Sequence, residues 1–568
     1  MIPRSDEHLG EYVPKRSERL AFISGFSGSA GFAIVLMANA TVFSDGRYTL
    51  QLETETDGKL WERLHIIDNP PESWARTHAA GLKLGYDPWL ISADGLKKFS
   101  GLNLVPVTTN PIDEIWLNQP PPPVAPALPH DMRFAGEDPT AKRERIAQML
   151  TSEGQDAALL TDPASIAWLF NIRGADVEFT PIALGFAVLN ADASATIFMA
   201  NEKTPPETLS HLGNHVTIAP PSSLPGALAS LAGKIVRYDP ATMPVWFKTT
   251  LEAAGAVIAE ASDPVALPRA QKNPVEQAGA RAAHVRDGVA MVRFLSWLSK
   301  AAPSGGETEM SAAAQLLKFR SKGEHFRGES FPAISGAGEH GAIIHYRVSP
   351  ETNRPIRPDE VFLIDSGGQY ADGTTDITRT IWTGPNEAPA SVKDHVTRVL
   401  AGHIALSTAV FPDGVAGPHL DSFARSALWQ AGLDYDHGTG HGVGSYLSVH
   451  EGPAGISRAA KPVPLKPGMI LSNEPGYYLP GAYGIRLENL VLVQPAEFAQ
   501  TDRKFLRFET LTLAPFDRAL IEPSVLPPSA LIWLNQYHKR VRETLTPLLD
   551  THHDAAALAW LEAATAPI

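Results

Sequence analysis

Two aspartates flank a predicted turn in the second half of the chain. Asp365 ends the apolar run at residues 361–364, and Asp376 follows the turn dipeptide Asp372-Gly373 at the start of a second short strand. A hairpin through this turn would bring the two carboxylates together, where they repel unless they are protonated or bind a metal ion. For this pair alone, a turn aspartate and a capping aspartate without chemistry are an equally good interpretation.

Three histidines follow within one glycine-rich stretch: His437, His441 and His450. Histidines four residues apart occur on zinc-binding helices, but the glycines between residues 438 and 444 make a helix improbable. The stretch is better interpreted as an extended segment or loop whose backbone closely approaches a ligand. A lone histidine is more often structural, whereas this grouping favours a functional site.

Two glutamates flank a second predicted hairpin. Glu474 follows the apolar strand at residues 469–471, and Glu488 lies among apolar residues after a loop that contains Gly481. A hairpin that turns near Gly481 would place the two glutamates opposite each other. The alternative is a pair of exposed hairpin glutamates.

Together these residues suggest a metal centre with two ions. The set is Asp365, Asp376, His441, Glu474 and Glu488. Oxygen-rich ligation with one nitrogen suits divalent ions, Mn²⁺ first, with Co²⁺ or Zn²⁺ as alternatives. Four carboxylates balance two dications, and two ions about 3.5 to 4 Å apart activate water and polarise a carbonyl group. The residues by themselves therefore predict a dinuclear hydrolase.

The elements that must position these residues follow an α/β pattern with several boundaries. The proline run at residues 120–123 reads as a stiff linker, and Asn273-Pro274 with Glu276 is a strong helix start. Beyond residue 355 the pattern changes to strands and turns, and the tail beyond about residue 515 is helical. The predicted parts are residues 1–117, a proline-rich linker at 118–130, residues 131–267, a catalytic part at 268–512 and a C-terminal extension at 513–568.

Composition excludes several classes of protein. A chain of 568 residues is too long for one ordinary core, and a net charge of −14 argues against a nucleic-acid-binding surface. The absence of cysteine excludes thiolate metal sites, a cysteine nucleophile and disulfides. No signal peptide is visible, and no apolar run approaches the roughly 18 to 20 residues that span a bilayer. We expect a cytoplasmic enzyme that binds neither nucleic acid nor membrane.

The motifs, in this order, resemble the pita-bread metallopeptidases, and most closely aminopeptidase P, the Xaa-Pro aminopeptidase, in its long three-domain form. The matching segments are SDEH at residues 5–8, FSGSAG at 26–31, DGRY at 45–48, IAWLFNIRG at 166–174, GAIIHY at 341–346, DGTTD at 372–376, HGTGH at 437–441 and WLNQYH at 533–538. Each is weak alone, but the ordered set spans nearly the whole chain and is highly specific.

The resemblance implies a fold and an activity. The fold is two creatinase-like α/β domains, then a pita-bread catalytic domain and a short helical extension. The activity is removal of the N-terminal residue from peptides with proline in the second position, by a hydroxide that bridges two metal ions. The resemblance also implies a homodimer. Long relatives usually begin with a helix and a strand ahead of residues 3–6, so the first domain is expected to lack its first helix.

Roles for individual residues also come from the resemblance. Asp365 would bind one ion through both oxygens, Asp376 and Glu488 would bridge both ions, and His441 and Glu474 would complete the second site. Glu474 would also take the proton of the attacking hydroxide. The remaining roles are substrate contact for His345 and His450, support for His437, and pairing with the carboxylates for Arg486.

Three alternatives remain on the same fold. Prolidase shares the metal ligands but cleaves Xaa-Pro dipeptides. Creatinase lacks the ligand set, so Asp365, Asp376 and Glu488 argue against it. A non-catalytic module that binds peptides or histones would have lost ligands that this chain retains.

Overall fold

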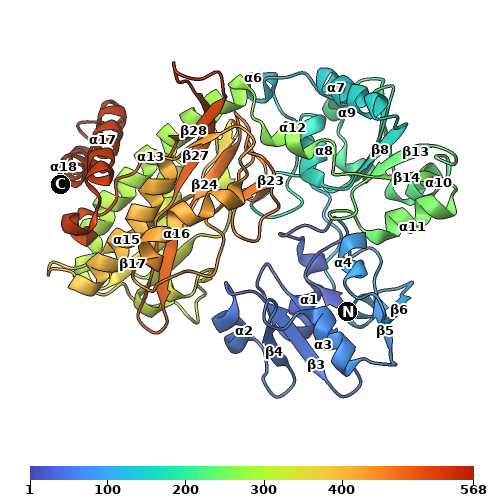
Figure 1. The fold of residues 1–568 in the computed structure, drawn as a ribbon, viewed down its shortest axis with the longest axis horizontal. Helices are drawn as coiled ribbons and strands as arrows, with labels where there is room; N and C mark the ends of the chain where they lie inside the picture. Colours follow the sequence, from blue (N-terminus) through green and yellow to red (C-terminus); the bar gives the residue numbers. More distant parts are fainter. The chain divides into compact units, whose positions relative to one another are not determined.

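The computed structural model describes all residues 1–568, and they form two compact units, Met1–Arg269 and Ala270–Ile568 (Figure 1). The two predicted N-terminal parts and the proline-rich segment between them all fall in the first unit. The predicted catalytic part and extension fall in the second. None of the helices combines the length and the apolarity that crossing a bilayer requires.

The first unit contains two main sheets. One has the strand order β1-β2-β3-β4, and the other has the order β12-β11-β10-β8-β13-β14. The strands are β1 Ile2–Pro3, β2 Phe32–Val35, β3 Ala40–Ser44, β4 Glu62–His65, β5 Lys83–Tyr86, β6 Asn103–Pro106, β7 Leu128–Pro129, β8 Ala157–Leu160, β9 Ile172–Arg173, β10 Phe186–Asn190, β11 Ala195–Phe198, β12 Val216–Ala219, β13 Ile235–Tyr238 and β14 Val257–Glu260. The helices are α1 Arg19–Ser24, α2 Thr49–Glu55, α3 Pro71–His78, α4 Ala93–Lys97, α5 Pro111–Ile115, α6 Met132–Ala135, α7 Pro139–Ser152, α8 Pro163–Leu169, α9 Pro206–Leu212, α10 Leu224–Ala229, α11 Val245–Ala253 and, at the boundary, α12 Ala266–Ala270.

The proline-rich segment is not entirely free of regular structure. Its last residues form β7, in which Leu128 pairs with Arg173 of β9. The backbone N–H of Ala127 also donates a hydrogen bond to the carbonyl of Lys203. The end of the predicted linker is therefore fixed to β9 and to Lys203, both in its own unit.

The second unit carries every predicted site residue. Its strands are β15 Phe326–Glu329, β16 Ile334–Ala337, β17 Val361–Ser366, β18 Gly368–Tyr370, β19 Gly373–Thr374, β20 Ile377–Trp382, β21 Val410–Pro412, β22 Gly440–Gly442, β23 Glu451–Ile456, β24 Ile470–Asn473, β25 Gly476–Leu479, β26 Tyr483–Arg486, β27 Asn489–Ala496 and β28 Phe505–Thr510. Its α-helices are α13 Pro274–Ala301, α14 Glu309–Arg320, α15 Ala390–Ser407, α16 Asp421–Trp429, α17 Pro528–Leu545 and α18 Ala555–Ala564. The site depends on two of its sheets, with the orders β16-β17-β20 and β21-β28-β27-β24-β22-β23.

The long helix α13 begins where the sequence predicts it. Asn273 caps the helix by accepting hydrogen bonds from the backbone N–H groups of Val275 and Glu276, and the Glu276 carboxylate accepts from the Asn273 N–H. This reciprocal capping box satisfies donors that would otherwise lack partners at the helix start.

The interpretation of residues beyond 355 as strands and turns was incomplete. Two helices, α15 and α16, interrupt that region and pack against each other. In α15 the buried residues Val392, Val396, Val399 and Leu400 recur at helical spacing. The β-branched side chains of the three valines favour strands when periodicity is ignored, and the spacing along one helical face decides the outcome.

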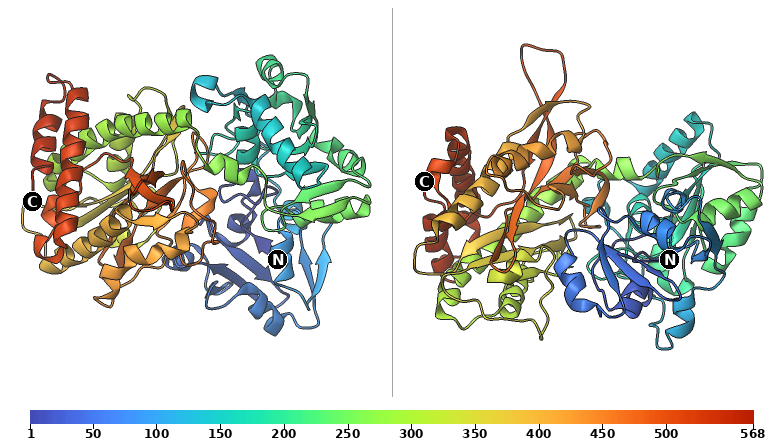
Figure 2. Two further views of the ribbon diagram at one scale, coloured as in Figure 1. Left: turned by 45° about the horizontal axis from the view of Figure 1, so that its top comes forward. Right: turned by 60° about the horizontal axis from the view of Figure 1, so that its bottom comes forward.

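The C-terminal helices α17 and α18 complete the core of the second unit. Leu534, Val541 and Leu561 are fully buried in one cluster with Val399 and Leu400 of α15. Figure 2 shows α17 and α18 side by side next to the long helix α13. The extension is thus part of the fold that supports the sheets, as the prediction of a helical tail implied.

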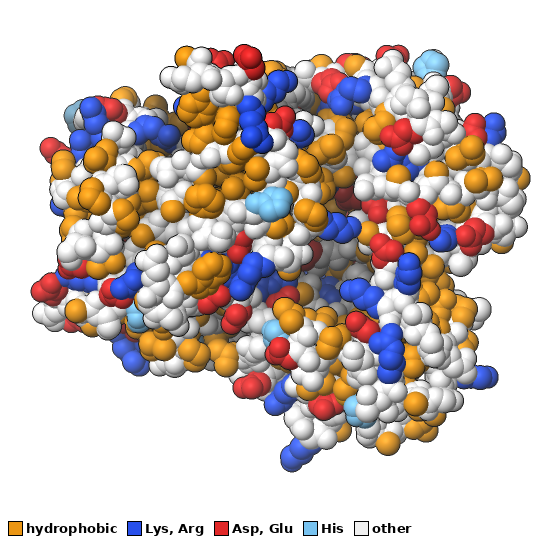
Figure 3. Space-filling model, viewed as in Figure 1, with side chains coloured by type: hydrophobic (Ala, Val, Ile, Leu, Met, Phe, Trp, Pro, Cys, Tyr) orange, Lys and Arg blue, Asp and Glu red, His pale blue; other side chains and the backbone are white.

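Charged side chains of both signs are mixed on the molecular face that Figure 3 shows. Lysines and arginines lie singly among aspartates and glutamates, with apolar side chains between them. This distribution matches the acidic but modest charge balance of the sequence.

Candidate metal centre

Asp365 and Asp376 lie on neighbouring antiparallel strands. Asp365 lies near the end of the buried strand β17 and pairs with Thr378 of β20, two residues beyond Asp376. Cross-strand partners and residues two apart on one strand project to the same face of a sheet. Asp365, Thr378 and Asp376 therefore project to the same face, and both carboxylates are buried. The hairpin prediction for this pair is confirmed.

His441 comes from the centre of the short strand β22. Its Nε2 atom lies 3.5 Å from Oδ2 of Asp376 and 3.4 Å from Oε1 of Glu474. Its Nδ1 atom lies 2.9 Å from the carbonyl oxygen of Gly442. A carbonyl only accepts, so Nδ1 carries a proton and Nε2 is the nitrogen that faces the acids, as in histidines that bind metal through Nε2.

Glycine on both sides of His441 lets β22 lie close to its neighbours. A Cβ atom on Gly440 would lie 2.0 Å from the carbonyl oxygen of Ser472, and one on Gly442 would lie 2.2 Å from that of Glu451. The prediction of an extended stretch is confirmed, whereas a close approach of this backbone to a ligand stays a prediction. The close neighbours are strands β23 and β24.

The two glutamates come together as predicted. Strands β24 and β27 pair so that Asn473 lies opposite Asn489, which places Glu474 and Glu488 at the same end of the pair. The hydroxyl of Thr378 donates to Oε2 of Glu488 at 2.8 Å, and Ser472 donates to Oε1 of Glu474 at 3.1 Å. Both hydroxyls fix the orientation of a carboxylate.

These pairings produce one cluster of metal-binding atoms. Ligand atoms of Asp376, His441 and Glu488 all lie within 4.8 Å of one another. Glu474 joins this cluster through the contact of its Oε1 with Nε2 of His441. Asp365 lies beside Thr378, and its buried Oδ1 atom has no hydrogen-bond partner. The donors are carboxylate oxygens and one imidazole nitrogen, a set that suits divalent ions of intermediate hardness. The residues present therefore fit a metal centre.

Arg486 connects Asp365 to His437 through the hydroxyl group of Tyr478. It donates to Oδ2 of Asp365 at 2.7 Å and to the hydroxyl oxygen of Tyr478 at 2.7 Å. The Tyr478 hydroxyl also lies 2.9 Å from Nε2 of His437, whose Nδ1 atom lies 2.8 Å from the Gly438 carbonyl. Because that carbonyl fixes the proton on Nδ1, the tyrosine hydroxyl donates to Nε2.

Burial and mutual repulsion raise the pKa values of the carboxyl groups in the cluster. Burial raises the pKa of Asp365, although Arg486 opposes the rise. Burial raises the pKa of Glu474 to about 7, and burial with the charges of Asp376 and Glu474 raises the pKa of Glu488 well above its usual range. Such carboxylates are costly to ionise together without a cation.

The pKa of His441 is also raised, but interactions with the acids cause the rise and burial opposes it. Burial alone would lower its pKa, but the hydrogen bond to Asp376 and the charge of Glu474 raise it to about 9. The imidazole thus lies in a strongly negative environment. A bound cation would take the place of that proton.

The two remaining histidines occupy different positions. The ring of His450 meets that of His441 edge to face, with centroids 4.3 Å apart. His345 is half-buried and lies just after the short 3-10 helix η5 Gly338–Ala342, which packs against β26.

Several residues around the centre were missed from sequence. Thr378 and Ser472 orient the ligands Glu488 and Glu474, and Tyr478 joins Arg486 to His437. A further buried ion pair joins Lys272 to Glu451, the residue after His450. Thr378 and Ser472 gave a local signal, because each lies two residues from a predicted ligand, Asp376 and Glu474. The contact of Tyr478 with His437 and the pair of Lys272 and Glu451 join segments far apart in sequence.

Comparison with known proteins identifies the family. Residues 278–495 match Metallopeptidase family M24, residues 118–276 match the Creatinase/Prolidase N-terminal domain, and residues 504–568 match the C-terminal region of peptidase M24. The similarities below extend over the whole chain. The protein belongs to metallopeptidase family M24, and it has the creatinase N-terminal and pita-bread architecture that the resemblance implied.

Its relatives carry more particular names. Aminopeptidase P1 of Lotus japonicus is 37% identical, over 100% of this chain and 96% of the relative. A probable Xaa-Pro aminopeptidase P of Coprinopsis cinerea is 38% identical, over 100% of this chain and 95% of the relative. A solved structure, an X-prolyl aminopeptidase from Caenorhabditis elegans described as a cytosolic enzyme with a di-nuclear active site, is 34% identical with a TM-score of 0.94 and covers 100% of this chain and 94% of that one.

Proposed function

We propose that the protein is a metal-dependent Xaa-Pro aminopeptidase, which removes the first residue of peptides whose second residue is proline. The observation that carries the proposal is the cluster of Asp376, His441 and Glu488 in a chain similar over its full length to aminopeptidases P. A prolidase-like dipeptidase is the alternative enzyme. A peptide-binding module without catalysis is the alternative outside enzymes, and the retained ligand set argues against it.

The proposed metal ligands are Asp365, Asp376, His441, Glu474 and Glu488. We propose two divalent ions, with Mn²⁺ as the first candidate and Co²⁺ or Zn²⁺ as alternatives, because the donors are four carboxylates and one imidazole. When bound, the ions lower the pKa of a water molecule and polarise the scissile carbonyl group.

Glu474 is the proposed general base. Its Oε1 lies 3.4 Å from Nε2 of His441, so the carboxylate faces the proposed metal site and can accept a proton there. The Ser472 hydroxyl holds Oε1, so the carboxylate keeps one orientation. His437 lies with Nδ1 4.0 Å from the other oxygen, which places it as a supporting residue.

His450, His345 and Arg486 complete the proposed site. His450 packs edge to face on His441 and would contact the substrate from that side. His345, which precedes the metal ligands in sequence, is also proposed to contact the substrate. Arg486 pairs with Oδ2 of Asp365 and leaves Oδ1 without a hydrogen-bond partner, so its role is to position a ligand. The Xaa-Pro bond itself lacks an N–H, so recognition rests on shape and on the carbonyl.

The decisive experiment compares two substrates. Purified protein loaded with Mn²⁺ is expected to release the first residue of an Xaa-Pro-Zaa tripeptide and to act poorly on the Xaa-Pro dipeptide. A preference for the dipeptide would establish the prolidase alternative, and no turnover of either peptide would favour the binding module. Chelation is expected to abolish activity, and added Mn²⁺ to restore it.

The role of Glu474 has its own test. Glu474→Gln is expected to lower kcat by about 100-fold or more, because the general base is lost. Glu543→Gln is the matched control, since Glu543 is 64% exposed and pairs only with Lys539 at the surface. Chelator-resistant turnover, or full activity in Glu474→Gln, would contradict the proposed centre.

The remaining proposals concern organisation. We propose parts at residues 1–117, 131–267, 268–512 and 513–568, with the linker at 118–130. We propose a cytoplasmic location, which the Caenorhabditis elegans enzyme is described as having. We propose a homodimer, which analytical ultracentrifugation of the purified protein tests directly.

A further inference from the structure

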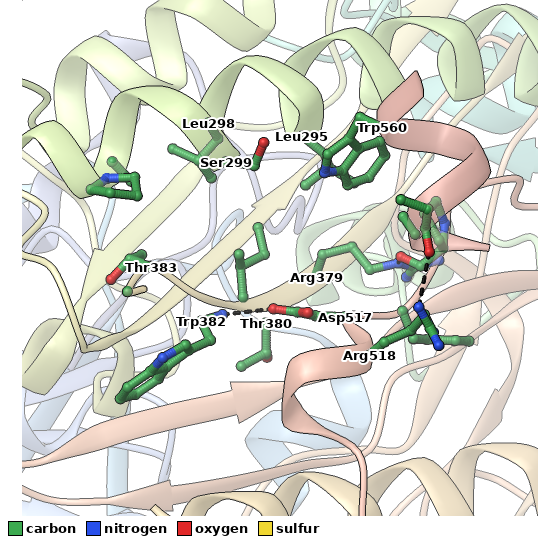
Figure 4. A pocket seen from close by; sticks show the side chains of 18 residues that line it. Leu295, Leu298, Ser299, Arg379, Thr380, Trp382, Thr383, Asp517, Arg518 and Trp560 are labelled. Atoms are coloured by element: carbon green, nitrogen blue, oxygen red, sulfur yellow. Dashed lines mark hydrogen bonds between the residues drawn. The ribbon is translucent and has the colours of Figure 1, made fainter. Parts of the chain in front are cut away.

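A cavity of about 340 Å³ lies in the second unit, apart from the acidic cluster, between α13, β20 and α18. Its walls are mainly apolar and include Leu295, Leu298, Phe516 and Trp560. Figure 4 shows Leu298 and Ser299 of α13 on one side, Asp517 and β20 opposite them, and Trp560 beside Leu295. A cavity of this size holds a small organic molecule.

Asp517 supplies the only carboxylate of this wall. Its Oδ2 accepts a hydrogen bond from the backbone N–H of Trp382 at 2.8 Å, and its Oδ1 accepts one from that of Ala519 at 3.0 Å. Burial raises the pKa of Asp517. An ionised carboxylate accepts about four hydrogen bonds, so two positions remain for another donor.

The two arginines of the wall are engaged elsewhere. Arg379 directs its donors to carbonyl groups, including those of Pro515 and Glu488, and to Asn489. Arg518 donates to the carbonyl oxygens of Ala563 and Pro567 at the end of the chain. No lysine, arginine or histidine forms an ion pair with Asp517. The cavity therefore has an anionic group that no cation of the chain neutralises.

We propose that this cavity binds a small ligand with a primary ammonium group attached to an apolar, preferably aromatic, body. The ammonium group would donate to the open positions of Asp517, and the body would lie against Leu298 and Trp560. Aromatic side chains and a carboxylate together favour such amphipathic cations. An anion would be repelled by Asp517, and a neutral molecule would leave its charge uncompensated.

The cavity shares a wall with the proposed metal centre but is a separate site. Strand β20 starts directly after Asp376 and reaches the cavity at Arg379, about 10 Å further along at the usual rise of a strand. Arg379 connects the two, since it lines the cavity and donates to the backbone carbonyl of Glu488 at 2.6 Å. The inference does not rest on the proposed peptidase activity.

Calorimetric titration of the metal-loaded protein with three probes tests the proposal. The probes are 2-phenylethylamine, its neutral analogue 2-phenylethanol and the anion 3-phenylpropanoate. The amine is expected to bind one site per chain, about tenfold or more tighter than the alcohol, and the anion weakest. Equal binding of amine and alcohol, or no binding of the amine, would overturn the proposal.

Two variants assign the binding to this cavity. Asp517→Asn is expected to weaken amine binding about tenfold while alcohol binding stays unchanged. Ser299→Leu is expected to weaken both, because the larger side chain fills the space beside Leu298. Its matched control is Ser304→Leu, since Ser299 and Ser304 are both exposed and each hydroxyl donates to the carbonyl three residues earlier.

The controls keep the test decisive even if Asp517→Asn disturbs the fold. Ser299 is on the surface of α13, so its substitution is expected to leave the melting temperature unchanged. Amine binding that persists in Ser299→Leu at the affinity of Ser304→Leu would place the amine elsewhere, for example at the bound metal ions, and would refute the proposed site.

Discussion

Two histidines of the glycine-rich stretch, His437 and His441, differ in what their Nε2 atoms contact. In His441 the Gly442 carbonyl engages Nδ1, which leaves Nε2 directed at Asp376 and Glu474. In His437 the Gly438 carbonyl engages Nδ1, and Tyr478 donates to Nε2. The hydrogen bonds of the second nitrogen therefore distinguish a proposed ligand from a supporting residue.

A histidine outside the centre makes stability depend on pH. His403 of α15 is completely buried, and neither ring nitrogen has a hydrogen-bond partner. Burial, with the charge of Arg379, lowers its pKa to about 3. Between pH 6.5 and 3 the unfolded chain therefore binds a proton that the folded chain does not. Stability contributed by the neutral ring is complete above pH 6.5 and is lost as the pH falls.

His403→Phe is expected to remove this acid sensitivity. Between pH 7 and pH 5 one such histidine lowers the free energy of unfolding of the wild type by about 2 kcal/mol. The variant should not show this loss. Chemical denaturation at the two pH values measures the difference. His553→Gln is the control, because the His553 side chain is 85% exposed. An unchanged pH slope in His403→Phe would show that the ring is already protonated or hydrated in the folded protein.

At the level of elements, hairpins bring the acids together. The sequence allowed this prediction because apolar runs, Asp372-Gly373 and Gly481 mark strands and turns locally. The network of Arg486, Tyr478 and His437 was only partly predictable, since the role of Tyr478 depends on how β25 and β26 lie beside the glycine-rich strand. The cavity beside Asp517 was not predictable, because its walls come from segments far apart in sequence.

The same dependence on tertiary packing explains the missed helices. Residues 390–407 carry valines that favour strands, yet one helical face of α15 packs against α16 and α17. Local propensity is a weak guide where packing decides. The capping box at Asn273, in contrast, is a local signal, and it located the start of α13 correctly.

The spacing between β22 and β24 gives a prediction for the element that carries His441. In Gly440→Ala the new Cβ atom would meet the Ser472 carbonyl oxygen, so the strands must separate. The hydrogen bond from the His441 N–H to the Ser472 hydroxyl, now 2.9 Å, would weaken. We expect metal affinity to fall about tenfold or more and stability by about 2 kcal/mol.

Metal titration and thermal unfolding measure these two effects. Gly226→Ala is the matched control, because Gly226 lies in helix α10 and a Cβ atom there would meet nothing within 4 Å. That change is expected to leave metal binding intact and to stabilise its helix by up to about 1 kcal/mol. Equal metal affinity in Gly440→Ala and the wild type would show that β22 tolerates displacement.

At the scale of the molecule, the proposed active site lies within one of the two units. The proposed ligands and catalytic residues all belong to residues 270–568, and the large apolar clusters of that unit draw on its own helices and strands. The helices α17 and α18 contribute to the largest of them. A unit with a closed core of this kind meets the physical requirement for independent folding.

We therefore predict that a fragment of residues 270–568 folds cooperatively and binds Mn²⁺ without the first unit. Ions that bind only the folded state at 100 times their dissociation constant stabilise it by about 2.7 kcal/mol, which raises the melting temperature by roughly 5 °C. Thermal unfolding with and without Mn²⁺ measures the shift. The same fragment with Asp376→Ala should lose the shift, because Asp376 contacts His441 at the centre of the cluster. A folded fragment with no Mn²⁺-dependent shift would mean that the first unit is needed to complete the metal centre.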